Sequence, residues 1–185
     1  MTFAVEYPNL RPVFLWLHDG CPYDAKVLPE ILEELRRRRI LRIKDIFIGD
    51  KEYCKYDNYK LAFSKYRVIP LIFPRKDFSI EKILSQSYSM EIYEESKSTE
   101  KEKQFFMELH KEFEEKLSEW EDFRPIRRII EDVFKLLKEG FFKEKIHRYT
   151  KKSCERFIAC GVLLAGVIFS EGFRSKEHLQ TMAEW

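Results

Sequence analysis

The amino-terminal part of the chain alternates short apolar runs with turns and one amphipathic segment. Residues 2–6 (TFAVE) and 12–17 (PVFLWL) are both rich in apolar residues, and the turn-forming residues between them predict a β-hairpin. The apolar spacing over residues 25–39 predicts a helix with Asp24 as its N-cap. Residues 45–50 then predict a buried strand that ends at Asp50, at the end of a strand where ligands gather in open α/β sheets. An aspartate in that place also commonly caps the next turn.

The middle of the chain continues with a helix, a strand and a long polar segment. Residues 56–66 predict a short helix, and residues 67–73 predict a strand whose Pro70 favours an edge position or a bulge. Serine, glutamate and lysine dominate much of residues 74–104. We interpret this segment as an irregular insertion without chemistry of its own.

The remainder of the chain is predicted to be helical. Apolar and aromatic residues recur at helical spacing over residues 104–120, and further helices are predicted at 124–138 and at about 149–169. The apolar run 157–169 is too short to span a bilayer and is expected to form a buried helix. The complete order of elements predicts a mixed sheet with helices packed against it.

The helix predicted at residues 124–138 has two distinct sides. One side is apolar, and the other carries Arg127, Glu131 and Lys138, which align in a polar stripe. Pro125 suits the first turn of a helix because its missing N–H would have no partner there. A glutamate between two cations can be a solvated surface ion pair, which is common on exposed helices, or a fixed carboxylate facing a site. The apolar side consists of Ile126, Ile129, Ile130, Val133 and Leu137.

Composition adds few constraints. The 185 residues include 34 basic and 32 acidic side chains, so the net charge of +2 does not indicate nucleic-acid binding by itself. The four cysteines have no paired short spacing, which disfavours a zinc site or a disulfide framework. Because the sequence starts without the basic and apolar regions of a signal peptide, we expect a cytoplasmic protein that does not enter a membrane.

Two blocks of residues carry a resemblance to a known family. Arg127, Glu131 and Lys138 are separated by three and six residues, and Asp50 precedes Tyr53 with two residues between them. This pattern resembles the DDE transposases of bacterial and archaeal insertion sequences, in the group with a tyrosine–arginine–glutamate–lysine signature. Arg124 stands where that group has tyrosine, and Glu52 replaces the glycine of its aspartate block. The resemblance extends from Met1 to about Ser170.

The resemblance implies a function in DNA transposition by metal-dependent strand cleavage and transfer. Asp50 and Glu131 would be the second and third metal-binding carboxylates, since Mg²⁺ or Mn²⁺ prefers oxygen ligands. The expected partner is double-stranded DNA, at the ends of the element and at its target. The chain would act as a homo-oligomer or with a missing amino-terminal half. The residues expected to contact DNA or its phosphates are Arg127, Lys138, Tyr53 and Arg124.

The fold implied by the resemblance is an α/β fold of the ribonuclease H-like type, with a mixed sheet and flanking helices. Its first central strand, which bears the first catalytic aspartate, has no counterpart among the predicted elements. We therefore expect residues 1–148 to be a truncated catalytic domain with a polar insertion at about 75–104. Residues 149–185 would be its carboxy-terminal helix and tail. Such a chain is expected to be inactive alone.

Two other functions are compatible with the sequence. The first is a non-catalytic DNA-binding or interaction protein derived from a transposase, which would contact phosphates through its basic clusters. The second is a metal-dependent nuclease of the same fold that completes its site differently. The clusters available to the binding protein are Arg36–Arg39, Arg75-Lys76 and Arg127-Arg128.

Overall fold

The computed structural model describes residues 2–17, 24–74, 76, 78–87, 99–135, 150–173 and 177. The chain divides into two compact units, one made of residues 1–21 and 125–185 and the other of residues 22–124. The predicted mixture of helices and strands is confirmed. The described strands form two separate two-stranded sheets, however, in place of the single mixed sheet that the sequence predicted. Among the described residues, no strand of one sheet pairs with a strand of the other.

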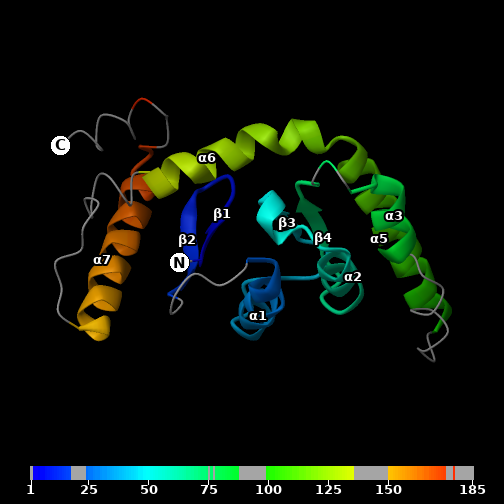
Figure 1. Cartoon of the computed structure of the whole chain (residues 1–185), viewed down its shortest axis with the longest axis horizontal. Helices are drawn as coiled ribbons and strands as arrows, with labels where there is room; N and C mark the ends of the chain where they lie inside the picture. The colour runs from blue at the N-terminus through cyan, green and yellow to red at the C-terminus, as the bar shows by residue number, and fades with distance from the viewer. Residues whose placement is uncertain are drawn as a thin grey trace. The chain divides into compact units, whose positions relative to one another are not determined.

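The first unit is built on a hairpin. Strands β1 (Thr2–Glu6) and β2 (Arg11–Trp16) pair antiparallel, which confirms the predicted hairpin. Helix α7 (Lys151–Ser170) lies beside β2 (Figure 1). A Cβ atom added to Gly166 would lie 3.1 Å from Cδ of Pro12, so the glycine permits the close approach of this helix to the strand.

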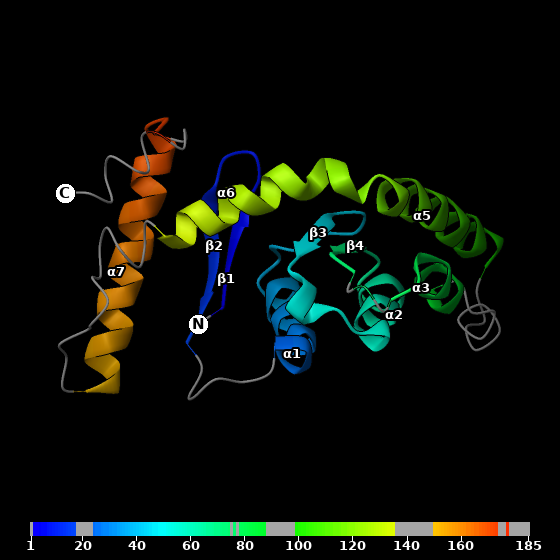
Figure 2. The same ribbon diagram turned by 45° about the horizontal axis from the view of Figure 1, so that its top comes forward.

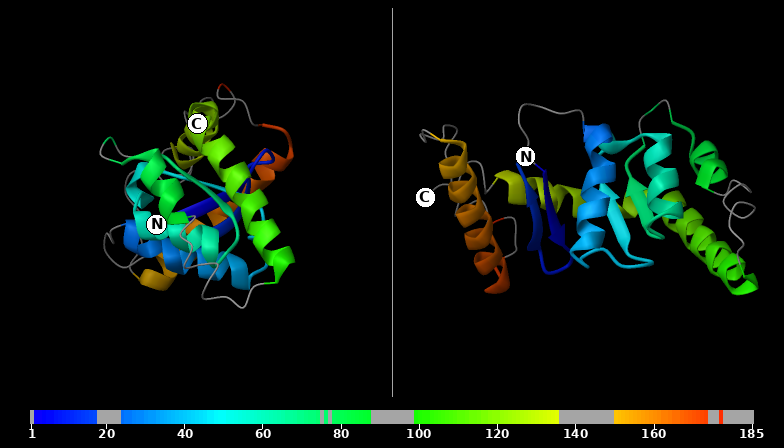
Figure 3. Two further views of the ribbon diagram at one scale, coloured as in Figure 1. Left: turned by 90° about the vertical axis from the view of Figure 1, so that its right-hand side faces the viewer. Right: turned by 90° about the horizontal axis from the view of Figure 1, so that it is seen from below.

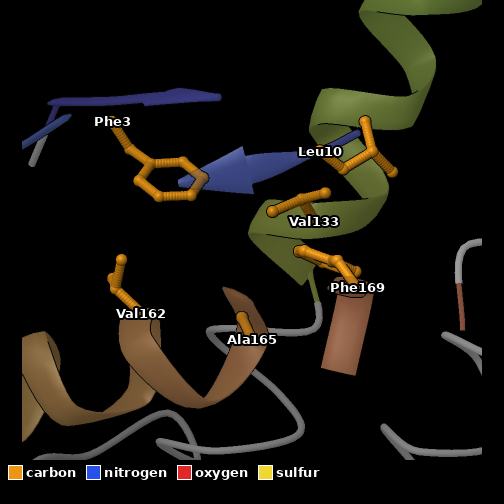
Figure 4. Packing of buried hydrophobic residues seen from close by; sticks show 6 residues of the cluster. All are labelled: Phe3, Leu10, Val133, Val162, Ala165 and Phe169. Carbon is orange, nitrogen blue, oxygen red and sulfur yellow. The ribbon is translucent and has the colours of Figure 1, made fainter. Parts of the chain in front are cut away.

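A cluster of buried apolar side chains holds this unit together. Helix α6 (Arg124–Lys135) contributes Val133, which has no exposed surface, and Ile129 packs against the cluster. The apolar side predicted for this helix is thus confirmed at these positions. Burial of each such side chain contributes about 1.5–3 kcal/mol to the free energy of unfolding. The buried members, seen in Figure 4, are Phe3, Leu10, Val133, Val162, Ala165 and Phe169.

Helix α7 closely follows the helix predicted at about 149–169. Its 20 residues have a mean hydropathy of 1.6 over the most apolar window, which by length and composition is enough to cross a membrane. The apolar run 157–169 is only part of this helix, which begins six residues before the run. One such helix is weak support for a membrane span, since core helices of soluble proteins share these properties. Its buried face packs in the cluster of the first unit, whereas Leu163 and Val167 are exposed.

The second unit has a parallel pair of strands at its centre. Strands β3 (Ile46–Gly49) and β4 (Ile69–Ile72) pair in parallel, with Gly49 opposite Ile72. Helices α1 (Asp24–Arg37) and α2 (Tyr56–Ser64) precede β3 and β4 respectively and lie side by side (Figure 2). These four elements confirm the predicted order, and Pro70 lies in a strand that has β3 as its partner. The capping role predicted for the Asp24 side chain lies outside the described residues.

The segment between β4 and the long helix is more ordered than predicted. It contains α3 (Ile80–Ser87), and α5 (Glu100–Ser118) begins within it, so the prediction of an irregular segment is wrong for these residues. Figure 3 shows α3 beside α5. Two local features explain the helices: Ile83 is fully buried, and Thr99 and Glu102 form a reciprocal capping box. Whether this segment is an insertion stays a prediction. A 3₁₀ turn, η2 (Trp120–Phe123), follows α5.

A proline inside α1 creates a requirement that α2 meets. Pro29 has no N–H, so it cannot donate the helical hydrogen bond to the carbonyl of Ala25. The Nδ2 amide of Asn58 donates to that carbonyl at 2.9 Å and also to the carbonyl of Tyr53 at 2.9 Å. Asn58 is only 2% exposed, and its bond to Ala25 is buried whereas its bond to Tyr53 is partly buried. This one side chain joins α1, α2 and the turn that contains Tyr53.

We expect Asn58→Ala to lower the free energy of unfolding by about 2–3 kcal/mol, because it leaves buried carbonyls without a donor. In a Pro29→Ala background the loss should be smaller by about 1 kcal/mol, since the new N–H at position 29 can donate to Ala25. Urea denaturation of the four proteins of this double-mutant cycle measures the difference. Equal losses in both backgrounds would show that the amide does not compensate for the proline.

Candidate functional site

Asp50 lies directly after β3, at the carboxyl end of the parallel strand pair. It is the N-cap of a 3₁₀ turn, η1 (Lys51–Tyr53), and its backbone is extended with φ −72° and ψ 159°. Its Oδ1 accepts a hydrogen bond from the backbone N–H of Lys51 at 2.7 Å. The side chain is half-buried. The predicted position at the end of a strand is confirmed, and the capping role considered for Asp50 is also realised.

Two buried side chains hold the turn that carries Asp50. Asn58 binds the carbonyl of Tyr53, and the hydroxyl of Tyr59 lies 3.6 Å from the sulfur of Cys54, which follows the turn. The Tyr59 hydroxyl also donates to the carbonyl of Ile72, the last residue of β4, at 2.6 Å. Tyr59 is fully buried, and burial raises the pKa of its phenol, so the hydroxyl keeps its proton and remains a donor. Sequence reasoning missed both residues. The sequence feature that could have identified them is that each places a polar atom on the apolar side of the helix predicted at 56–66.

Glu131 lies on α6 and pairs with Arg127. The carboxylate Oε1 of Glu131 is 2.8 Å from a guanidinium nitrogen of Arg127, one helical turn earlier. The side chain of Glu131 is 56% exposed and that of Arg127 is 32% exposed. A pair of this kind contributes only about 0.2–0.5 kcal/mol to helix stability, so it gives little structural reason for these residues. The stripe predicted from the sequence is thus formed by its first two members, whereas Lys138 lies outside the described residues.

Arg124 and Tyr53 are the other two residues expected to contact DNA. The guanidinium of Arg124 is 2.9 Å from the Glu121 carboxylate and 5.4 Å from the ring centroid of Trp120. An aromatic face and an acid therefore orient this cation at the first residue of α6. Tyr53 is half-buried and ends η1, three residues after Asp50. Contact with DNA stays a prediction for both residues.

The described residues supply only part of the set of ligands expected for a metal site. Asp50 and Glu131 offer carboxylate oxygens, which suit Mg²⁺ or Mn²⁺. Within the described ranges, no three His, Cys, Asp or Glu side chains gather as a metal site. Asp50 belongs to the unit of residues 22–124 and Glu131 to the other unit. The two carboxylates alone do not fit a complete site for two metal ions, and their sharing of one site stays a prediction.

A hollow in the second unit has the wrong lining for this chemistry. Its empty volume is about 180 Å³, part of which is open solvent. Apolar side chains line it, so it offers a bound ion or a phosphate no charged side chain. They are Leu71, Ile72, Phe73, Leu117, Trp120 and Phe123.

The arginine run at the end of α1 is partly neutralised by one acid. The side chains of Arg37 and Arg38 both donate hydrogen bonds to the Glu34 carboxylate, with nitrogen–oxygen distances of 2.6–2.8 Å. Hydrogen bonds from Arg37 and then Arg38 lower the pKa of Glu34 to about 2. The helix ends at Arg37, two residues earlier than predicted. The Arg36 guanidinium donates to the carbonyl of Leu41 at 3.3 Å, so three of the four arginines have an internal partner, which weakens the run as a phosphate-binding cluster. Arg75 of the second predicted cluster lies outside the described residues.

Comparison with known proteins gives one match. A family model described as the transposase DDE domain matches residues 7–166. No curated protein and no solved structure is significantly similar to the chain. The matched segment contains Asp50 and the whole of α6, and it covers both units.

The pKa of Glu34 can be measured directly. Its carboxyl ¹³C signal should titrate with a midpoint near 2, and in Arg37→Gln/Arg38→Gln the pKa should return toward that of a free glutamate, about 4.3. Because the folded pKa is depressed, the stabilisation is present above the unfolded pKa and is lost as the pH falls toward the folded value. Glu112, on α5, serves as an internal control that the substitution should leave unchanged. A Glu34 midpoint unaffected by the substitution would contradict this account.

Proposed function

The chain belongs to the transposase DDE domain family, and on that premise we propose that it is part of a DNA strand-transfer enzyme in which Asp50 and Glu131 supply two of three metal-binding carboxylates. The observation that carries this proposal is the family match over residues 7–166, a segment that includes both acids. DNA is the partner expected of a transposase. Two further features support the assignment: Asp50 follows a parallel strand, and Glu131 lies on the polar side of a helix whose other side is buried.

We further propose that the chain has the α/β fold of the ribonuclease H-like type that the family implies. The order of hairpin, helix, parallel strand, helix and parallel strand supports this arrangement. A two-stranded sheet is marginally stable by itself and gains from further strands. The proposal requires one more strand, which would carry the first aspartate and would come from outside the described elements. Such a strand would make the enzyme complete, and without it the chain is truncated in function.

The side chains of the chain have distinct parts in this proposal. Asp50 and Glu131 would hold Mg²⁺ or Mn²⁺, and the bound ion would supply the Lewis acid for displacement at phosphorus. Asn58 and Tyr59 contact the turn that follows Asp50, at Tyr53 and Cys54 respectively. Arg127, which pairs with Glu131 on α6, would contact phosphate. Arg124, Tyr53 and Lys138 would contact the DNA backbone.

A proximity measurement tests whether the two acids share a site. In a background with Cys21, Cys154 and Cys160 changed to serine, Asp50→Cys/Glu131→Cys should be joined by a bis-maleimide with a span of about 8 Å, the reach of a two-ion site. Asp50→Cys/Ile130→Cys is a matched control, because the preceding residue of the helix points about 100° away. Mass spectrometry measures the yield of each cross-link. Low and equal yields in both variants would remove the basis for a shared site.

Activity of the purified chain provides the second test. We expect no nicking of supercoiled plasmid in Mg²⁺ or Mn²⁺, because two carboxylates cannot position two metal ions as three can. Gel electrophoresis after long incubation measures nicking, with a standard nuclease as the positive control. Metal-dependent nicking that is lost in Glu131→Gln would prove the chain active alone, and cleavage without strand joining would identify it as a nuclease.

A further inference from the structure

Basic residues gather at the amino end of the parallel strand pair, away from Asp50. The loop from α1 to β3 and the loop from α2 to β4 both lead into this end, because the two strands are parallel. The backbone N–H of Lys44 donates to the carbonyl of Arg67 at 2.8 Å, which ties the two loops together. We name as the basic edge the four residues Arg39, Arg42, Lys44 and Arg67.

Three of these four residues have an unusual backbone conformation. The φ angles of Arg39, Lys44 and Arg67 are 59°, 66° and 57°. In this left-handed region the Cβ atom of an L-residue is strained, and glycine or asparagine is the usual occupant. A long cation has no local structural advantage at such a position. Its repeated presence in two neighbouring loops points to a use for the charge.

An aromatic ring and two acids hold part of the basic edge in place. The Lys44 ammonium and the Arg67 guanidinium lie 5.5 Å and 5.7 Å from the ring centroid of Phe105. Glu108 and Glu102 of α5 each approach one of these cations at 3.7 Å. At this distance the ion pairs are loose, and all four side chains are 38–56% exposed. An incoming anion can therefore compete for both cations.

The other two members of the basic edge are open to solvent. Arg39 and Arg42 are exposed, and within the described part of the chain their side chains make no hydrogen bond or ion pair. This distinguishes them from Arg37 and Arg38, which bind Glu34. The backbone N–H of Arg42 donates to the Asp45 carboxylate at 2.7 Å, so the loop itself is fixed.

We propose that the basic edge binds the phosphate backbone of duplex DNA. A duplex carries one negative charge per about 1.7 Å of its axis, so it matches a surface on which several exposed cations follow one another along two joined loops. DNA is also the partner expected of the family to which the chain belongs. The proposal goes beyond the strand-transfer site and does not depend on metal binding by Asp50 or Glu131. It gives the chain a second DNA contact at the opposite end of the same strands.

Fluorescence anisotropy with a labelled duplex, measured in EDTA, tests the proposal without the metal site. Arg39→Gly/Arg42→Gln should reduce affinity on the order of tenfold at about 100 mM salt and lower the slope of log affinity against log salt by about 2. Its melting temperature should be unchanged or higher, because glycine relieves the left-handed strain at position 39. The matched control, Lys103→Gln/Lys111→Gln, removes the same charge from exposed positions of α5 and should bind as the unmodified chain does.

A second variant is expected to increase the affinity for DNA. Glu102→Gln/Glu108→Gln releases Arg67 and Lys44 and should strengthen DNA binding several-fold, whereas the charge-matched Glu114→Gln/Glu115→Gln should leave it nearly unchanged. Misfolding of the variant cannot explain an increase in DNA affinity. Equal effects in the test and control variants would show that net charge alone governs binding and would overturn the proposal, as would unchanged affinity in both test variants.

Discussion

The second unit depends on a hydrogen-bonding requirement that a proline creates and a buried amide satisfies. Pro29 leaves the carbonyl of Ala25 without its helical donor, and Asn58 supplies that donor from α2. The second N–H of the same amide binds Tyr53, in the turn that begins after Asp50. The position of the Asp50 turn and the packing of α1 are therefore fixed together. A buried polar group is tolerated here because both of its donor hydrogens have partners.

In the first unit, apolar contacts of helix α6 fix the orientation of the helix and of its polar side chains together. Burial of Val133 among Phe3, Leu10 and Phe169 determines which side of the helix faces the hairpin. The periodicity of the helix then determines the direction of Arg127 and Glu131, on the side away from that cluster. The exposed ion pair is too weak to orient the helix, so the core of the unit positions the candidate carboxylate.

Elements with a clear apolar period were predictable, and features that depend on distant partners were not. The hairpin, β3, β4 and the apolar side of α6 followed from local pattern alone. The helix α3 was missed because the composition of its neighbourhood is polar, although Ile83 is fully buried against the rest of the unit. For the site, the sequence placed Asp50 at the end of a strand and Glu131 beside Arg127. It could not reveal the bonds of Asn58 and Tyr59, because their acceptors lie as many as 33 residues away.

The near balance of charge in the composition conceals a separation of charge in space. Each end of the parallel pair β3–β4 has its own loops, and the loops at the carboxyl end present Asp50 whereas those at the amino end present the basic edge. A net charge of +2 is therefore compatible with a strong local attraction for phosphate, because exposed charges more than about 10 Å apart are largely screened from one another in salt. If Asp50 holds a metal ion as proposed, its carboxylate would repel DNA in the absence of that ion. The basic edge at the opposite end of the strands would then let the chain bind DNA before any metal is bound.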